Sequence, residues 1–217
     1  MAIDRNKRTL IALMILLLGI SPDLSSAEDF AVALYAGQLT KEKWENAIVP
    51  GAEFTDASIV VASASWTYLR FFQGNLSFEL EGQVGKYFGE QDNWEINLPI
   101  LGFRWHRFPW DDHLATSIAW GIGSSYATQV PKVELETNDS SSKWLIYWFL
   151  ELTFGPPTAN WEVLTRLHHR SNGVGLVAAD GGSTAVCAGL RCRGFGTGTL
   201  VERGGTRGRW VVSAGGM

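Results

Sequence analysis

Residues 76–85 read LSFELEGQVG, and polar and apolar side chains alternate along this stretch. One face carries Leu76, Phe78, Leu80, Gly82 and Val84, and the other carries Ser77, Glu79, Glu81, Gln83 and Gly85. Alternation with a period of two is typical of a β-strand that has one apolar and one polar side. The same pattern recurs in WEINLPI at 94–100 and in WLIYWFLELTF at 144–154. The chain is therefore predicted to be all-β.

Eight segments alternate in this way, and each is about as long as the roughly 9–11 residues that a tilted transmembrane strand needs. They lie near 30–39, 57–70, 75–87, 93–106, 114–127, 143–154, 160–171 and 183–193. A soluble β-sandwich alternates too, but its strands average only about 5–6 residues. The apolar faces also carry Trp, Phe and Leu at nearly every second position. The sequence predicts an eight-stranded antiparallel outer-membrane β-barrel over residues 28–193, its interior filled by side chains.

Composition and charge limit the class of protein. The 217 residues include 10 Trp, 11 Phe and 24 Gly, as expected for a barrel with aromatic belts. Hydrophobic residues make up 46% and charged residues 18%, which excludes both a disordered chain and a bundle of membrane helices. The formal net charge of −4 gives no support to a nucleic-acid partner. Two cysteines cannot provide a disulfide framework.

The two ends of the chain differ from the barrel. Residues 1–27 have a basic start, eleven apolar residues at 10–20 and small residues at Ser25 and Ala27. This arrangement predicts a secretory signal peptide, because eleven residues are too few to cross about 30 Å of hydrocarbon as a helix. Residues 194–217 are rich in Gly and Arg and show no sustained apolar alternation, so they are predicted to form an atypical tail outside the barrel.

The joins between the predicted strands also differ in length. The second, fourth and sixth joins are short, whereas the first and fifth, at 40–56 and 129–142, are long and polar. Outer-membrane barrels have short periplasmic turns and longer external loops. With both termini in the periplasm, the lengths match this arrangement.

The chemistry lies near the end of the seventh strand, where residues 161–172 read WEVLTRLHHRSN. The even positions are more charged and are expected to line the interior. The odd positions, which include His169 and Ser171, are expected to face lipid near the external leaflet. A serine hydroxyl becomes a good nucleophile when an imidazole takes its proton, so this pair could attack an ester of an outer-leaflet lipid. Alternatively, both residues belong to the polar interfacial rim of the barrel.

At these residues the sequence resembles a known family. LHHRSNG at 167–173, DGGS at 180–183 and AGLR at 188–191 resemble the lipid A deacylases of the PagL type, which are also called acyloxyacyl hydrolases or lipid A 3-O-deacylases. The resemblance implies an eight-stranded barrel in a Gram-negative outer membrane, with His169 as base and Ser171 as nucleophile. Asn172 is then a candidate oxyanion donor. The implied reaction is hydrolysis of the ester-linked 3-hydroxyacyl chain of lipid A in lipopolysaccharide, with no cofactor and no metal.

The resemblance is incomplete at the residue that orients the histidine. Members of the family place a Glu about a dozen residues after the Ser, and here that position is Ser183. The nearest acid is Asp180, which we take as the candidate partner of His169, while Glu162 and Glu151 are expected to point inward. An orienting acid holds the tautomer of the histidine and stabilises the imidazolium. Its absence favours the alternative function, a non-catalytic small outer-membrane barrel with a structural or adhesive role.

Overall fold

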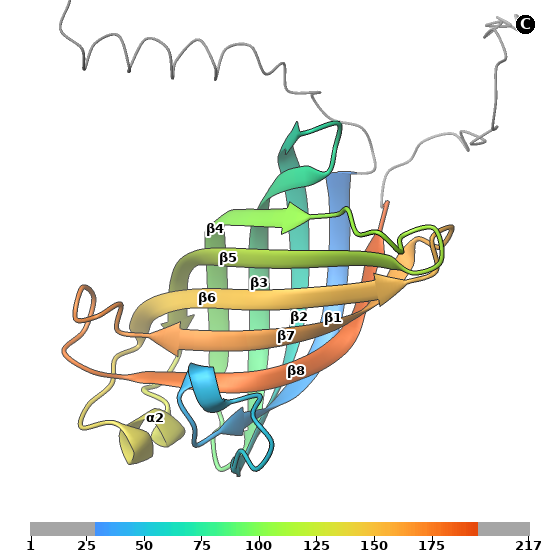
Figure 1. Ribbon diagram of the computed structural model, residues 1–217. Coiled ribbons are helices and arrows are strands. Elements are labelled where there is room, and N and C mark those ends of the chain that lie inside the picture. The colour runs from blue at the N-terminus through green and yellow to red at the C-terminus, as the bar shows by residue number, and fades with distance from the viewer. Residues whose placement is uncertain (1–28, 195–217) are drawn as a thin grey trace, which may run out of the picture.

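The computed structural model describes residues 29–194, which form a closed barrel of eight antiparallel strands (Figure 1). The predicted signal peptide and the predicted tail from residue 195 onward lie outside the described residues. The strands are β1 (Phe30–Thr40), β2 (Phe54–Phe71), β3 (Leu76–Gly89), β4 (Trp94–Trp105), β5 (Ala115–Ala127), β6 (Trp144–Gly155), β7 (Trp161–Ser171) and β8 (Gly182–Arg193). Each strand pairs with its neighbours in the chain, and β1 pairs with β8 to close the barrel. The predicted fold is confirmed.

The strands follow the predicted alternation, with apolar side chains outside and polar ones inside. In β4, for example, Trp94, Ile96 and Leu98 are exposed on the outer wall, whereas Glu95 and Asn97 are buried in the interior. This is the reverse of a soluble protein, because the outer wall of the barrel faces hydrocarbon. In the described part of the chain, no helix is long and apolar enough to cross a bilayer.

Ion pairs between strands fill the middle of the barrel. Arg104 lies 2.9 Å from Glu79 and 2.8 Å from Glu151. Arg166 donates to Glu151 at 2.7 Å and to Glu81 at 2.6 Å. Each of these charges is buried, and a buried charge is tolerated only when it is paired and hydrogen-bonded. The interior is therefore a cross-linked polar core, which agrees with the prediction that side chains fill it.

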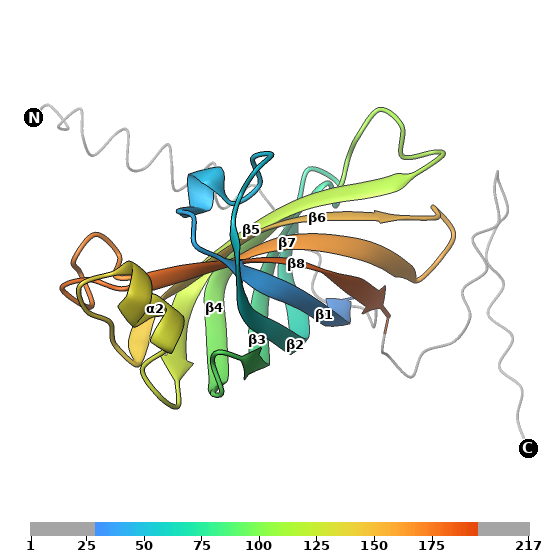
Figure 2. The ribbon, with the colours of Figure 1, turned by 90° about the horizontal axis from the view of Figure 1, so that it is seen from below.

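The long joins after β1 and β5 lie at one end of the barrel, as predicted, together with the short join at 90–93. The joins after β1, β5 and β7 lie at one end, and the ends of the described chain lie at the other (Figures 1 and 2). We call residues 41–53 loop 1, residues 128–143 the lid and residues 172–181 loop 7. Loop 1 contains a short 3-10 helix, η2 (Trp44–Asn46), and the lid contains α2 (Lys132–Thr137). By the topology of small outer-membrane barrels, this is the external end.

The interior network gives a stability prediction for Arg166. We expect Arg166→Met to lower the free energy of unfolding by about 3–5 kcal/mol, because it leaves Glu81 and Glu151 without their shared cation. Urea unfolding in lipid vesicles measures the change. Thr165→Leu, on the exposed outer wall of the same strand, is the matched control and should unfold like the parent. Equal stability of the two variants would contradict a structural role for this ion pair.

Candidate active site

At the external end of β7, side chains point alternately into the barrel interior and toward the outside of the barrel. His168 and Arg170 are buried in the interior, where His168 lies 2.7 Å from Glu95. His169 and Ser171 project from the opposite face, toward the outside of the barrel, as the alternation predicted. The strand registers bring Trp148 of β6 and Thr184 of β8 opposite His169.

His169 is covered rather than open to lipid, with only 9% of its surface exposed. The ring of Trp148 lies against it, with the ring centroids 4.7 Å apart. Trp44 of loop 1 packs edge-on against Trp148 at a centroid distance of 5.4 Å. Trp148 of β6 thus covers the histidine ring, and Trp44 of loop 1 packs on Trp148. The alternation of the strand predicts that His169 faces lipid, but it carries no information on this cover, because only the folded loop brings Trp44 to β6.

Thr184 is the hydrogen-bond partner of His169. The Nδ1 atom of His169 lies 2.8 Å from the Thr184 hydroxyl oxygen. When Nδ1–H donates to this hydroxyl, the lone pair of the imidazole is on Nε2, the nitrogen that accepts a proton from a nucleophile. Thr184 was not predicted as the partner of His169, because the expected partner was an acid. The register of β7 and β8 across loop 7 identifies it, since His169 and Thr184 are cross-strand partners.

Ser171 lies on the same face as His169, two residues further along β7. Its hydroxyl oxygen accepts a hydrogen bond from the Gly173 amide at 3.4 Å. Among the described residues no hydrogen bond joins Ser171 to His169. Catalytic hydrogen bonds are often long in unliganded proteins and shorten when substrate binds. The structure therefore places Ser171 and His169 on one face, with the Gly173 N–H beside the Ser171 hydroxyl.

Asn172 and Asp180 hold loop 7 in shape. The Asn172 side chain donates to the Ala179 carbonyl at 3.3 Å and accepts from the Val174 amide at 3.2 Å. Its amide group has a second N–H, which can donate to a ligand. Asp180 accepts a hydrogen bond at 2.9 Å from the amide of Asp139 in the lid. Within residues 29–194, no hydrogen bond joins Asp180 to His169.

The two other acids considered for His169 are engaged inside the barrel. Glu162 accepts a hydrogen bond from Arg191 at 2.7 Å. Glu151 pairs with Arg104 and Arg166 in the interior network. Both point inward, as predicted, and the barrel wall separates them from the face that carries His169.

A cavity of about 430 Å³ opens beside Ser171 and His169. Its lining comes from loop 1, the lid, Trp148, and the ends of β7 and β8 with loop 7. The lid closes the barrel mouth next to this cavity, because Glu134 on α2 is buried and lies 3.2 Å from Arg170. Glu134 also accepts hydrogen bonds from Ser183, at 2.9 Å, and from Ser141. The cavity lies at the external rim of the barrel, where its lining includes His169 and Ser171 of the outer face and also Arg170 of the interior face.

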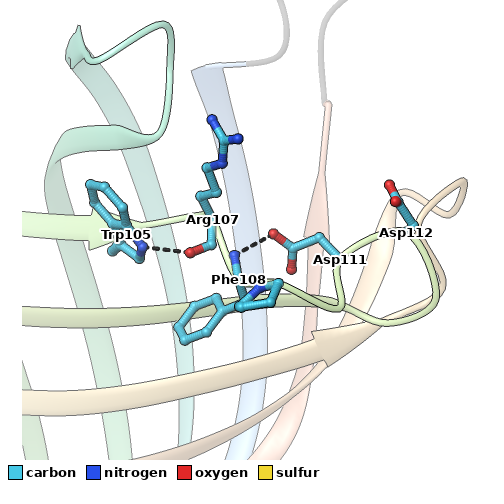
Figure 3. Close-up of a pocket in the computed structure, with 6 residues that line it drawn as sticks. Trp105, Arg107, Phe108, Asp111 and Asp112 are labelled. Carbon is cyan, nitrogen blue, oxygen red and sulfur yellow. Dashed lines mark hydrogen bonds between the residues drawn. The ribbon is translucent and has the colours of Figure 1, made fainter.

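A second cavity, of about 580 Å³, lies at the β4–β5 turn at the opposite end (Figure 3). It is lined by Trp105, Arg107, Phe108, Pro109, Asp111 and Asp112. Asp111 holds the turn by accepting a hydrogen bond from the Phe108 amide at 2.6 Å. This lining has no serine, cysteine or histidine, so it offers no nucleophile with a base. Over residues 29–194 no group of three or more His, Cys, Asp or Glu side chains is placed to hold a metal ion.

Comparisons with known proteins support the fold. No family model and no curated protein matches the chain in sequence. Among solved structures, the outer membrane enzyme PagL is similar, with a TM-score of 0.52 and 14% identity over 74% of this chain and 97% of that one. Neisserial surface protein A has a TM-score of 0.46 at 14% identity, covering 77% of this chain and 97% of that chain. The outer membrane protein OprG from Pseudomonas aeruginosa has a TM-score of 0.38 at 12% identity, covering 80% and 97%.

The likeness to PagL agrees with the fold described above, a small closed antiparallel β-barrel of the outer-membrane type. At these identities, the similarity concerns the fold and not the reaction.

The buried carboxyl of Glu134 predicts a pH dependence of the lid. Burial raises the pKa of Glu134 above its ordinary value of 4.5, although Arg170 partly opposes this effect. Because the folded state holds the proton more tightly, the contribution of Glu134 to lid docking is greatest at low pH and is lost as the pH rises through the raised pKa. Hydrogen exchange of the α2 amides, corrected for the intrinsic rate, should show protection that falls with rising pH.

Two variants on the same helix separate this effect from general pH dependence. Glu134→Gln should flatten the profile, whereas Glu136→Gln, on the exposed side of α2, should keep it. A profile that is unchanged in Glu134→Gln would contradict the assignment.

Proposed function

We propose that this barrel is an outer-membrane esterase that hydrolyses the ester-linked 3-hydroxyacyl chain of lipid A. The observation that carries the proposal is the position of His169 and Ser171 on the outer wall, beside a cavity and near the external end. The esters of outer-leaflet lipids lie at this level of the membrane, so the nucleophile meets its substrate without leaving the barrel wall. The resemblance of residues 167–173 to the deacylase motif and the similarity to PagL in fold point to the same reaction.

In the proposed reaction, the Ser171 hydroxyl oxygen attacks the ester carbonyl while His169 Nε2 takes its proton. The carbonyl oxygen becomes an oxyanion, and the candidate donors to it are the Gly173 amide, which lies beside the Ser171 hydroxyl, and the second N–H of the Asn172 side chain. The intermediate then expels the sugar hydroxyl, to which His169 returns the proton. In the second half, His169 deprotonates a water molecule that attacks the acyl-serine, releasing the 3-hydroxy fatty acid and restoring Ser171.

Thr184 takes the positioning role in this proposal that an acid takes in a Ser–His–acid triad. It holds His169 by Nδ1, which leaves Nε2 as the nitrogen that can accept the proton of Ser171. A neutral hydroxyl fixes the tautomer but stabilises the imidazolium less than a carboxylate does. We therefore expect a slower enzyme than one with an acid behind its histidine.

The surroundings of His169 also favour the second candidate function, a non-catalytic barrel. A histidine paired with a neutral hydroxyl and covered by a tryptophan is also a stable structural arrangement. The two candidates differ in one measurable property, which is whether lipid A loses an acyl chain.

The first test of the proposed function is the mass of lipid A extracted from an outer membrane that contains the folded barrel. We expect the loss of one hydroxyacyl mass with the parent chain and no loss with Ser171→Ala, which removes the nucleophile. Ser58→Ala is the matched control, because Ser58 is exposed on the outer wall of β2 and does not line the cavity. Intact lipid A beside a correctly folded parent barrel would contradict the enzyme and favour the non-catalytic candidate.

A second test concerns Thr184. Thr184→Val keeps the size of the side chain and removes the hydroxyl, so kcat should fall about fivefold, the effect of one neutral hydrogen bond of about 1 kcal/mol. Thr184→Ser keeps the hydroxyl and should retain most of the rate. KM should change little, because Thr184 acts through His169. If valine and serine give the same kcat, Thr184 does not position the base.

A further inference from the structure

The cavity at the β4–β5 turn opens on the outer face of the barrel. At the end of β4, Arg104 points into the interior and pairs with Glu79. His106 also points inside, and its Nε2 atom lies 2.8 Å from the Ser77 hydroxyl oxygen. Trp105, which lies between these two residues and lines the cavity, therefore points outward. The volume of about 580 Å³ is within the usual range of ligand-binding cavities.

This cavity lies at the level of the inner leaflet of the membrane. The β4–β5 turn is at the end of the barrel opposite to loop 1 and the lid, which is the periplasmic end (Figures 1 and 2). The rings of Phe108 and Trp110 lie together in this turn, with centroids 5.3 Å apart. Aromatic side chains gather where the hydrocarbon of a bilayer meets the headgroups. The neighbours of this cavity are therefore the headgroups of inner-leaflet phospholipids.

Hydrogen bonds hold the turn in one conformation. The Trp105 Nε1–H donates to the Arg107 carbonyl at 2.6 Å (Figure 3). The two carboxylate oxygens of Asp111 accept from the Phe108 amide, at 2.6 Å, and from the Thr116 amide, at 3.1 Å. A site whose parts are fixed in advance loses less conformational entropy when a ligand binds. The cavity is thus preorganised, and Asp111 is the residue that shapes it.

Arg107 and Asp112 bring one positive and one negative charge to the cavity. Within residues 29–194, neither the Arg107 guanidinium nor the Asp112 carboxylate has a hydrogen bond or an ion pair. The two side chains extend in the same direction from the turn (Figure 3). A guanidinium binds a phosphate through several N–H groups, and a carboxylate accepts hydrogen bonds from a primary ammonium. The two free charges therefore fit a ligand that carries a phosphate and an ammonium together.

We propose that this cavity binds the headgroup of phosphatidylethanolamine in the inner leaflet. Arg107 binds the phosphate and Asp112 binds the primary ammonium, while Trp105 and Phe108 contact the apolar part of the lipid below the headgroup. Phosphatidylglycerol has no ammonium, and phosphatidylcholine carries methyl groups where the ammonium has its N–H donors. Only phosphatidylethanolamine, among these three lipids, satisfies both charges. The bound headgroup holds the periplasmic end of the barrel at a fixed depth in the membrane.

A competition experiment on the full chain tests this headgroup preference. The folded barrel in detergent micelles receives equal amounts of phosphatidylethanolamine and phosphatidylcholine with the same acyl chains, and native mass spectrometry measures how much of each lipid is bound. A second mixture contains phosphatidylethanolamine and phosphatidylglycerol. We expect phosphatidylethanolamine to bind about fivefold more tightly than either competitor, which is the upper end of what an exposed ion pair contributes.

Two substitutions separate the two parts of the headgroup. Asp112→Asn removes the negative charge, so phosphatidylethanolamine and phosphatidylcholine should then bind equally. Arg107→Gln should weaken all three lipids about fivefold and keep the preference for phosphatidylethanolamine. Asp56→Asn and Lys143→Gln, which change exposed side chains at the external end, are the matched controls and should bind like the parent. Circular dichroism verifies that each variant is folded.

Every other pattern of binding overturns the proposal. Equal binding of phosphatidylethanolamine and phosphatidylcholine by the parent means that the cavity does not recognise the ammonium. A preference that survives Asp112→Asn comes from another part of the barrel. Unchanged affinity in Arg107→Gln means that the phosphate is not bound at this turn. Because the cavity lies at the opposite end from Ser171, these results do not depend on the proposed esterase activity.

Discussion

The closure of β1 on β8 is the constraint on which the rest of the structure depends. In hydrocarbon no water is available to the backbone, so every strand must have a hydrogen-bonded neighbour on each side. Closure then fixes which face of each strand is inside. Once Arg166 and His168 point into the polar core, His169 and Ser171 must project from the outer wall. The position of the candidate site is thus a consequence of barrel geometry.

The fold and the facing of the candidate residues could be predicted from the sequence, because both depend on a period of two. The strands of 76–89 and 144–155 show this clearly, since almost every outward residue is apolar. Contacts made by loops could not be predicted in this way. Trp44 reaches Trp148 only through the path of loop 1, and the pairing of Thr184 with His169 depends on the length of loop 7. Periodicity carries no information on either.

The buried glutamates of this barrel pair with cations in its interior. Glu79, Glu81, Glu95 and Glu151 each pair with a buried arginine or histidine, and Glu134 pairs with Arg170 from the lid. Because these pairs cross the interior from strand to strand, they serve the polar core. Their carboxylates are not available to the outer wall. Searching the sequence for the acid nearest to His169 therefore led to Asp180, whose partner is the amide of Asp139.

The neutral partner of His169 agrees with its surroundings. A carboxylate on the outer wall would be removed from water by the Trp44–Trp148 cover, and an isolated buried carboxylate is costly. A threonine hydroxyl satisfies Nδ1 at a smaller desolvation cost. A hydroxyl in place of a carboxylate also stabilises less well the imidazolium that forms in the transition state of the proposed reaction. In this arrangement, stability of the membrane-facing wall and speed of the proposed reaction oppose each other at a single residue, Thr184.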